Sequence, residues 1–484
     1  MLKTLLITLA TSSVLATAVA APPAHASTRQ ESIFQDDSTL ISSSDAKRQQ
    51  ALDEIKALGA TTVHSLLFWS RIAPDSDSKT KPAGFDATNP AAYPPGAWFQ
   101  YDQLVDEAQA RGLQVILSPV QAPHWADTCN SRGQAHHCKP RPSDYQQFVE
   151  AAGKNFPQVH RWSAWNEPNQ SHWLYPQRQK VRGHIIPTAA IEYRNLFRAM
   201  TAGLQATGHG GDQMLLGETA PLGRTTGPLG TRFLSPTEVF QGVFCLNSRG
   251  HKLRGTIAKL EGCSGRYAKL AATGIAHHPY NRGGSQPPTR RPTGPGEITI
   301  ANLSRLSAVI NQGSRARRIR GGLKFYFTEF GFQTNPPDRL FGVSLSRQAR
   351  YINQSDYIAY RNSRVAGVSQ YELFDDPVLS VFQTGLRFKD GRAKPSLGAY
   401  RLPIWVTRSG SGVRVWGQVR PAGGTPQTVA IQNGNKKFKT VKTVRTSSNG
   451  YFLVRVGHQA GPKWRLSWTS GGSTFTSRAA GIGT

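Results

Sequence analysis

Two glutamates occur in sequences that place a carboxylate at the end of a buried strand. Glu167 lies in the segment 165–169 (WNEPN), where a strand-like run meets a proline that cannot continue a strand. Glu329 follows the apolar run 324–328 and is flanked by aromatic residues, among which an isolated charge is costly. A salt bridge at a strand end would account for either glutamate alone. It accounts less well for the pair.

Two carboxylates that face each other across a pocket are what cleavage of a glycosidic bond requires. One carboxyl group, still protonated, gives a proton to the leaving oxygen, and the other, ionised, attacks the sugar or activates water. Their mutual repulsion helps to raise the pKa of the acid. Separations of about 5 to 5.5 Å go with retention of anomeric configuration and about 6.5 to 9.5 Å with inversion, and the sequence alone does not choose between them.

The elements that would position these glutamates alternate between strand-like and amphipathic helical runs. In the first repeat, Ser44 caps a helix that Gly59 ends, and the strand 62–69 follows. Eight such repeats over about 375 residues predict a closed (β/α)8 TIM barrel in residues 27–403, with both glutamates at its catalytic rim. A doubly wound open sheet is the alternative, but no G-x-G-x-x-G follows an early strand. The eight expected strands are 33–34, 62–69, 113–117, 161–166, 214–217, 274–278, 324–329 and 365–373.

Residues 404–484 read as a second, smaller domain. Short alternating runs separated by Gly-Gly and Asn-Gly turns predict a β-sandwich. From residue 405 onward there are twelve Lys or Arg and no Asp or Glu, in a chain whose formal net charge is +29. This excess favours contact with an anionic polymer of the cell envelope or an acidic polysaccharide, although a generally basic exported protein would look the same. Five aromatic residues of this domain could form a platform that stacks on sugars, but aromatics at alternating strand positions more often belong to the core of a sandwich. They are Trp405, Trp416, Tyr451, Trp464 and Trp468.

The N-terminal residues predict export. Lys3 precedes an apolar run over residues 5–20, and Ala24-His25-Ala26 offers the small-x-small pattern of a signal peptidase site. We therefore expect residues 1–26 to be a signal peptide and the mature, secreted protein to begin near Ser27. A membrane anchor is the weaker alternative, because Thr and Ser interrupt the run, and no later stretch reaches the roughly 20 apolar residues of a membrane span.

The four cysteines fall into two local pairs, Cys129 with Cys138 and Cys245 with Cys263. In an oxidising compartment such pairs favour disulfides. Zinc is the alternative, because His136 and His137 stand beside Cys138, but no C-x-x-C spacing is present. We expect two disulfides and no catalytic metal.

These motifs together resemble the signature of the clan A retaining glycoside hydrolases. The Asn166-Glu167-Pro168 triplet ends the fourth expected strand, Glu329 ends the seventh, and the resemblance covers most of residues 27–403. Among the members of the clan, families 39 and 5 are the most similar, with xylosidase-like, iduronidase-like and cellulase-like enzymes. Supporting segments are 69–74 (WSRIAP), 122–125 (APHW), 278–280 (HPY), 385–386 (GL) and 394–395 (KP).

The resemblance implies a secreted retaining β-glycosidase that acts on a polysaccharide or glycan, without a cofactor. It makes Glu167 the acid/base, Glu329 the nucleophile and Asn166 a hydrogen-bond donor to the sugar 2-hydroxyl, with Tyr280 holding the nucleophile ionised. Further substrate contacts are expected from His278, His124, Trp125, Trp69 and Tyr371, although packing would also explain the histidines and Trp125.

The sequence departs from this pattern in two places. Many clan members have an arginine in the second strand that supports the nucleophile, whereas the matching position here is His64, with Arg71 seven residues later. The usual tryptophan after the eighth strand is absent, so Tyr371, Phe374 or neither would stack on the sugar. Sugar specificity is therefore not implied.

Other acidic residues follow strands of the expected barrel. Glu218 ends the fifth strand and, with both catalytic roles filled, is expected to be a structural or subsite residue. After the eighth strand, Glu372, Asp375 and Asp376 could bind substrate hydroxyls or a cation, but their spacing resembles no calcium loop.

Two other function classes remain as alternatives. One is a non-catalytic carbohydrate- or envelope-binding protein on a barrel scaffold. The other, a nuclease or nucleic-acid binder, lacks a candidate metal cluster, and its charge would lie away from the barrel. We therefore expect no nucleic-acid partner.

Overall fold

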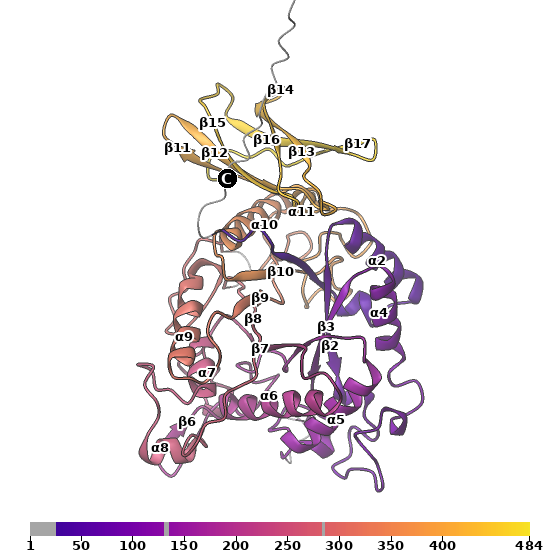
Figure 1. The fold of residues 1–484 in the computed structure, drawn as a ribbon, viewed down its shortest axis with the longest axis vertical. Helices are drawn as coiled ribbons and strands as arrows, with labels where there is room; N and C mark the ends of the chain where they lie inside the picture. Colours follow the sequence, from indigo (N-terminus) through magenta and orange to yellow (C-terminus); the bar gives the residue numbers. More distant parts are fainter. Residues whose placement is uncertain (1–25, 130–134, 283–285) are drawn as a thin grey trace, which may run out of the picture.

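The computed structural model describes residues 26–129, 135–282 and 286–484. Eight parallel strands close into a barrel in the order β1-β10-β9-β8-β7-β4-β3-β2 (Figure 1). The predicted (β/α)8 barrel is therefore confirmed and the open sheet excluded. Its strands are β1 (Glu31–Gln35), β2 (Thr62–Phe68), β3 (Gln114–Val120), β4 (Arg161–Ser163), β7 (Gln213–Thr219), β8 (Gly274–His277), β9 (Lys324–Phe327) and β10 (Val365–Tyr371).

Helices surround this barrel, and α2 (Asp45–Ala57) shows how the sequence defines one of them. The Ser44 hydroxyl accepts the Lys47 N–H at 3.4 Å, and Gly59 has a left-handed φ of +81° just after the helix. Its buried side chains pack into the core around the strands. The other helices are α1 (Asp37–Leu40), α3 (Trp69–Ile72), α4 (Phe99–Ala110), α5 (Pro142–Asn155), α6 (Thr188–Ala206), α7 (Pro236–Val243), α8 (Gly255–Leu260), α9 (Leu303–Arg315), α10 (Leu345–Tyr360) and α11 (Pro395–Arg401).

The loop between β4 and α6 carries a short antiparallel hairpin of β5 (Gln179–Val181) and β6 (His184–Ile186). Within the barrel, a layer of buried side chains from five strands fills the interior. The barrel is thus a packed core that is closed below the catalytic rim. This layer consists of Ile33, Ile116, Leu215, Ala276 and Tyr326.

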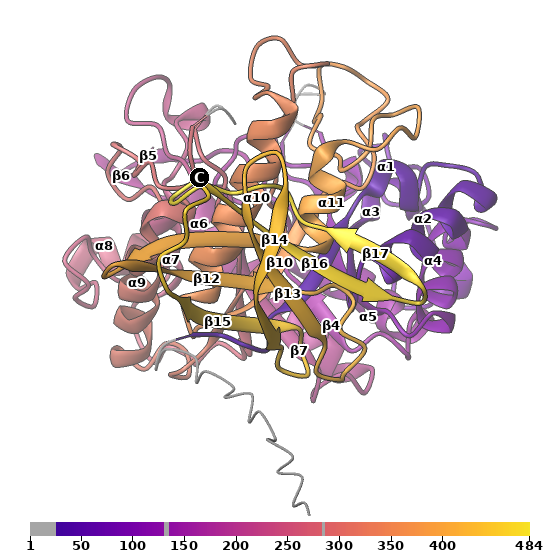
Figure 2. The same ribbon diagram turned by 90° about the horizontal axis from the view of Figure 1, so that it is seen from above.

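The C-terminal residues form two antiparallel sheets, β11-β12-β15 and β14-β13-β16-β17, as a sandwich requires. Seen from above, they lie across α10 and α11 (Figure 2). A buried Asp356–Arg420 pair, 3.2 Å between Oδ2 and Nη1, joins α10 to the sheets. The strands are β11 (Ile404–Ser409), β12 (Gly412–Gln418), β13 (Thr428–Gly434), β14 (Phe438–Arg445), β15 (Tyr451–Val456), β16 (Lys463–Ser470) and β17 (Ser473–Thr476).

The five aromatics of this domain are buried, which favours the core over the stacking platform. Trp464 and Trp468 belong to the sandwich core, whereas Trp405, Trp416 and Tyr451 pack against Tyr360 at the end of α10. The aromatics therefore stabilise the domain and its junction with the barrel.

The structure pairs Cys129 with Cys138 and Cys245 with Cys263, as the local spacing predicts. Of the expected signal peptide, residues 1–25 lie outside the described residues. In the described ranges, no helix combines the length and apolar character needed to cross a bilayer.

Candidate active site

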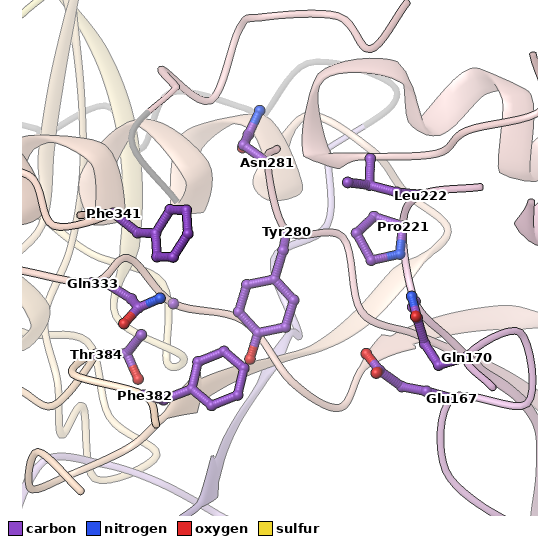
Figure 3. Close-up of a pocket in the computed structure, with 12 residues that line it drawn as sticks. Glu167, Gln170, Pro221, Leu222, Tyr280, Asn281, Gln333, Phe341, Phe382 and Thr384 are labelled. Atoms are coloured by element: carbon purple, nitrogen blue, oxygen red, sulfur yellow. The ribbon is translucent and has the colours of Figure 1, made fainter. Parts of the chain in front are cut away.

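Glu167 lines a pocket of about 300 Å³ at the C-terminal rim of the barrel (Figure 3). Figure 3 shows the Tyr280 side chain between Glu167 and Gln170 on one side and Gln333, Phe341, Phe382 and Thr384 on the other. The loops after β4, β7, β8, β9 and β10 all contribute to this pocket.

The two predicted glutamates converge next to this pocket. One carboxylate oxygen of Glu167, one of Glu329 and a ring nitrogen of His278 all lie within 4.8 Å of one another. The Nδ1 atom of His278 is 3.1 Å from Glu167 Oε1 and 3.5 Å from Glu329 Oε2. The Tyr280 hydroxyl donates to Glu329 Oε2 at 3.4 Å. Residues far apart in the chain thus share one site because they follow the C-terminal ends of different strands of the barrel.

Glu218 lies beneath this pair and is fully buried. Its carboxylate accepts hydrogen bonds from Ser163 and Thr328, the latter at 2.7 Å, and its Oε2 atom is 2.7 Å from Nε2 of His278. The imidazole of His278 therefore connects Glu218 to Glu167 and Glu329. This arrangement fits the structural role expected for Glu218.

The charges in this network shift one another. The His278, Ser163 and His64 side chains lower the pKa of Glu218 to about 2, against the opposing effect of burial. Burial lowers the pKa of His278, but Glu329, Glu167 and Glu218 raise it well above its ordinary value. His278 is therefore a cation at neutral pH, held between carboxylates.

Burial raises the pKa of Glu329 to about 8, with contributions from the charges of Glu167 and Glu218, and His278 opposes the increase. Glu329 therefore holds its proton more tightly than an exposed carboxyl group does.

The backbone of this site is strained. Trp165, Glu167 and Glu218 have backbone φ angles of 60°, 35° and 44°, which residues other than glycine rarely adopt. The Glu167 N–H donates to the Glu218 carbonyl oxygen at 2.9 Å and so couples the ends of β4 and β7. Gly217 precedes Glu218, and a Cβ atom there would lie 2.1 Å from the Ala276 carbonyl oxygen. Conformations this costly persist where the surrounding structure imposes them, and they are concentrated at functional sites.

Of the other expected contacts, Asn166 has the most suitable position. It is buried next to Glu167, and its side-chain oxygen has no hydrogen-bond partner among the described residues. Tyr371 ends β10, and its ring contacts Phe382, which lines the pocket. His64, in contrast, is turned toward the Ser118 hydroxyl and the Thr328 carbonyl oxygen, and burial lowers its pKa.

Three of the expected contacts lie in the core instead of the pocket. Trp69 is buried against Phe148 and Trp125, and the Trp125 indole donates to the Pro74 carbonyl oxygen. Nδ1 of His124 is 2.9 Å from the Asp127 carboxylate, and its ring is also buried. Packing accounts for all three side chains, so we leave them out of the proposed substrate contacts.

Two acidic residues that follow β10 have polar partners within the protein. Asp375 forms a buried pair with Lys394 at 2.5 Å, and the Thr384 hydroxyl donates to Glu372 at 3.1 Å. Both interactions fix the loop after β10. The pocket lining missed by the sequence reasoning comes from such loops, in which Gln333, Phe341 and Phe382 carry no motif.

Glu167, His278 and Glu329 are close enough to surround a metal ion. Both ring nitrogens of His278 already face carboxylates, Nδ1 that of Glu167 at 3.1 Å and Nε2 that of the buried Glu218 at 2.7 Å. The cluster therefore fits proton transfer better than metal binding. A second cluster consists of His160, His209 and Asp212. Its side chains bind one another, because the Asp212 carboxylate forms hydrogen bonds with both histidine rings.

Comparison with protein-family models gives no match, and comparison with curated proteins gives none either. Among solved structures, a β-glucosidase from Trichoderma harzianum has a TM-score of 0.49 at 14% identity, over 78% of this chain and 97% of that one. A GH30 endoxylanase from Clostridium papyrosolvens has a TM-score of 0.46 at 10% identity, over 92% and 96%. A calcium-binding mutant of β-glucuronidase 2 from Bacteroides uniformis has a TM-score of 0.44 at 12% identity, over 94% of this chain, which spans only 45% of that enzyme.

Proposed function

We propose that this protein is a secreted retaining β-glycosidase that hydrolyses O-glycosidic bonds of a polysaccharide or glycan. The observation that supports this most strongly is that the carboxylate of Glu329 lies within 4.8 Å of that of Glu167, which lines a pocket at the rim of the barrel. The separation of at most 4.8 Å between their nearest oxygens favours retention, because inversion needs a gap of about 6.5 to 9.5 Å for a water molecule. The two disulfides are consistent with an exported protein.

In the first step, Glu329 attacks the anomeric carbon while Glu167 gives its proton to the leaving oxygen. The bond from carbon to the leaving group breaks as the bond to Glu329 forms, which leaves a glycosyl ester and the free alcohol. In the second step, ionised Glu167 takes a proton from water, whose oxygen displaces Glu329. Glu167 is then protonated again, and the released sugar has its original configuration.

The neighbouring side chains stabilise the charges that move in these steps. The protonated Nδ1 of His278 reaches both glutamates, so it stabilises whichever one is ionised. The Tyr280 hydroxyl donates to the Glu329 oxygen at 3.4 Å and favours its ionised form. The buried amide of Asn166 would bind the sugar 2-hydroxyl, a contact that tightens in the transition state.

The test is a screen of aryl glycosides and polysaccharides with the wild type beside Glu329→Ala and Glu167→Ala. We expect both variants to lose activity by about 100-fold or more. Azide should rescue Glu329→Ala and give a product of inverted configuration. Glu150→Ala on α5, whose side chain contacts only Gln146 through a hydrogen bond, serves as the control. Activity at the wild-type level in either catalytic variant would contradict the proposal.

If both catalytic variants bind glycans as the wild type does and no glycoside is cleaved, a non-catalytic carbohydrate-binding protein becomes the better interpretation. A separate contact with an anionic polymer is supported by the basic side chains of the C-terminal domain. Lys436, Lys437, Lys439, Lys442 and Arg445 are all exposed on or beside the edge strand β14. Such a surface would concentrate the enzyme on an anionic substrate or envelope.

A further inference from the structure

The loops after β9 and β10 expose an unusual amount of apolar surface. Nine large hydrophobic side chains are exposed in the described part of the chain, and six of them lie on these two loops. Leu340 is 86% exposed and Leu379 is 60% exposed. Soluble proteins rarely gather such residues without a binding function. The six side chains are Leu340, Phe341, Val378, Leu379, Val381 and Phe382.

These side chains line a groove of about 1140 Å³ between the two loops. The groove shares three lining residues, Gln333, Phe341 and Phe382, with the catalytic pocket. Figure 3 shows these three on the side of Tyr280 that is opposite Glu167. The apolar groove therefore adjoins the pocket that Glu167 lines.

The loops that hold this groove are fixed by buried polar contacts. Asp338 accepts the N–H groups of Leu340 and Phe341 at 2.8 and 3.1 Å, which turns both side chains outward. Thr334 and Gln383 join the two loops through a backbone hydrogen bond of 3.0 Å, and Lys394 donates to the Thr334 hydroxyl. The apolar tips are therefore presented by a built framework.

The chemistry of the lining indicates what the groove accepts. Sugar subsites need several hydrogen-bonding groups and flat aromatic faces. Polar residues and two phenylalanines also line this groove, but the most exposed of its apolar side chains, Leu340, Leu379 and Val378, are branched and aliphatic. They would gain most from burying methylene groups. We propose that the substrate is an amphiphilic glycoside, whose sugar occupies the pocket and whose aliphatic chain lies in this groove. This inference rests on the proposed glycosidase function and adds the class of substrate.

Continuity with the catalytic pocket favours a substrate chain over the other occupants of an apolar surface. A lipid bilayer or a second copy of the protein would cover the loop tips, but neither would require the lining shared with the pocket. The shared Phe341 and Phe382 connect the groove to the position of the reacting bond. The chain can be carried by the leaving group or by the sugar itself.

The experiment uses two series of probes built on a sugar that the aryl glycoside screen identifies. One is n-alkyl glycosides from ethyl to decyl, and the other is 4-nitrophenyl glycosides acylated with chains of the same lengths. Calorimetry measures binding below the critical micelle concentration, and initial rates give KM and kcat. We expect the dissociation constant to fall by about fourfold for each methylene group buried, until the groove is filled.

Leu340→Asn and Leu379→Asn should abolish this dependence on chain length and leave hydrolysis of the unacylated 4-nitrophenyl glycoside unchanged. Both side chains are exposed, so folding should be preserved. Ile185→Asn replaces another exposed apolar residue, which lies on β6 and is 53% exposed, and is the matched control. It should retain the wild-type response to chain length.

The outcomes separate this inference from the proposed function. If neither series depends on chain length while the unacylated glycoside is still hydrolysed, the inference is overturned and the glycosidase stands. Chain-dependent binding without hydrolysis supports the groove and contradicts only the glycosidase. Two other results, each without any effect of chain length, would assign the surface differently. Binding to phosphatidylcholine vesicles that the two variants lose would assign it to a membrane. A concentration-dependent dimer that the two variants lose would assign it to a second copy of the protein.

Discussion

Replacing Glu218 by glutamine would remove one negative charge from beneath the active site with little change in side-chain shape. The pKa of Glu218 is lowered from its ordinary value of 4.5 to about 2, chiefly by His278, and the group is buried. A difference of this size corresponds to about 3 kcal/mol of stability at neutral pH. We therefore expect Glu218→Gln to reduce the free energy of unfolding by about 3 kcal/mol at pH 7.

The sign of the pH dependence follows from the direction of the shift. Because the folded-state pKa is depressed, the contribution of Glu218 is present above pH 4.5 and is lost as the pH falls toward 2. The difference in stability between wild type and variant should therefore shrink over that interval. Urea unfolding at several pH values, followed by tryptophan fluorescence, measures it.

The same substitution should change catalysis through His278. Without the Glu218 carboxylate 2.7 Å away, the pKa of His278 falls, and the cation beside Glu329 is weakened. A unit charge at 3.5 Å interacts with Glu329 by about 5 kcal/mol at an effective dielectric constant of about 20. The pKa of Glu329 should therefore rise further, so the kcat/KM profile should move to higher pH by one unit or more.

A suitable control is Asp356→Asn. This substitution breaks the buried ion pair with Arg420, which joins α10 to the C-terminal sheets. It should cost stability in the same range of about 3 to 5 kcal/mol without moving the pH profile. If Glu218→Gln leaves both the stability at pH 7 and the pH profile unchanged, the assigned network is wrong. A loss of stability with an unchanged profile would reduce Glu218 to a purely structural residue.

Three further outcomes are expected. The kcat/KM of the wild type should rise as the pH increases through about 8, because Glu329, the proposed nucleophile, must be ionised to attack, and Glu167→Gln assayed with a dinitrophenyl leaving group should show this rise at lower pH, because the charge of Glu167 contributes to the raised pKa of Glu329. Lys439→Glu with Lys442→Glu should elute from a sulfated polysaccharide column at lower salt than wild type, with unchanged hydrolysis of aryl glycosides. Removing the Cys245–Cys263 disulfide by two serine substitutions, which opens a loop with a sequence separation of 18, should cost about 3 kcal/mol in urea unfolding.

The barrel could be predicted from the sequence because each strand is short, apolar and followed by a turn signal, and these are local properties. The ends of the strands were less well predicted. The fourth strand was expected to reach Asn166, but β4 ends at Ser163. Trp165 and Glu167 adopt left-handed backbone conformations there, and the N–H of Glu167 bonds to the end of β7. A contact between distant segments decides this conformation, so local sequence does not reveal it.

The site shows the same division. Glu167, Glu329, His278 and Tyr280 could be found because strand-end motifs place them at the rim, and the structure brings them together. Trp69 also follows a strand, yet it turns into the core, and a motif does not state the direction of a side chain. The groove residues were missed for a different reason. Exposed leucines and valines in long loops carry no catalytic signal, and only their assembly in space is informative.

The histidine in the second strand connects these observations. Where an arginine would give the nucleophile a permanent positive charge, His64 is buried, has a lowered pKa and faces Ser118, while Arg71 lies over the ring of Phe68. The cation that contacts Glu329 is instead His278, whose charge can be lost. A buried imidazole stays protonated only if carboxylates surround it, which explains why Glu218 is ionised at the bottom of the site. The charge of His278 and the buried carboxylate of Glu218 are therefore two parts of one electrostatic arrangement.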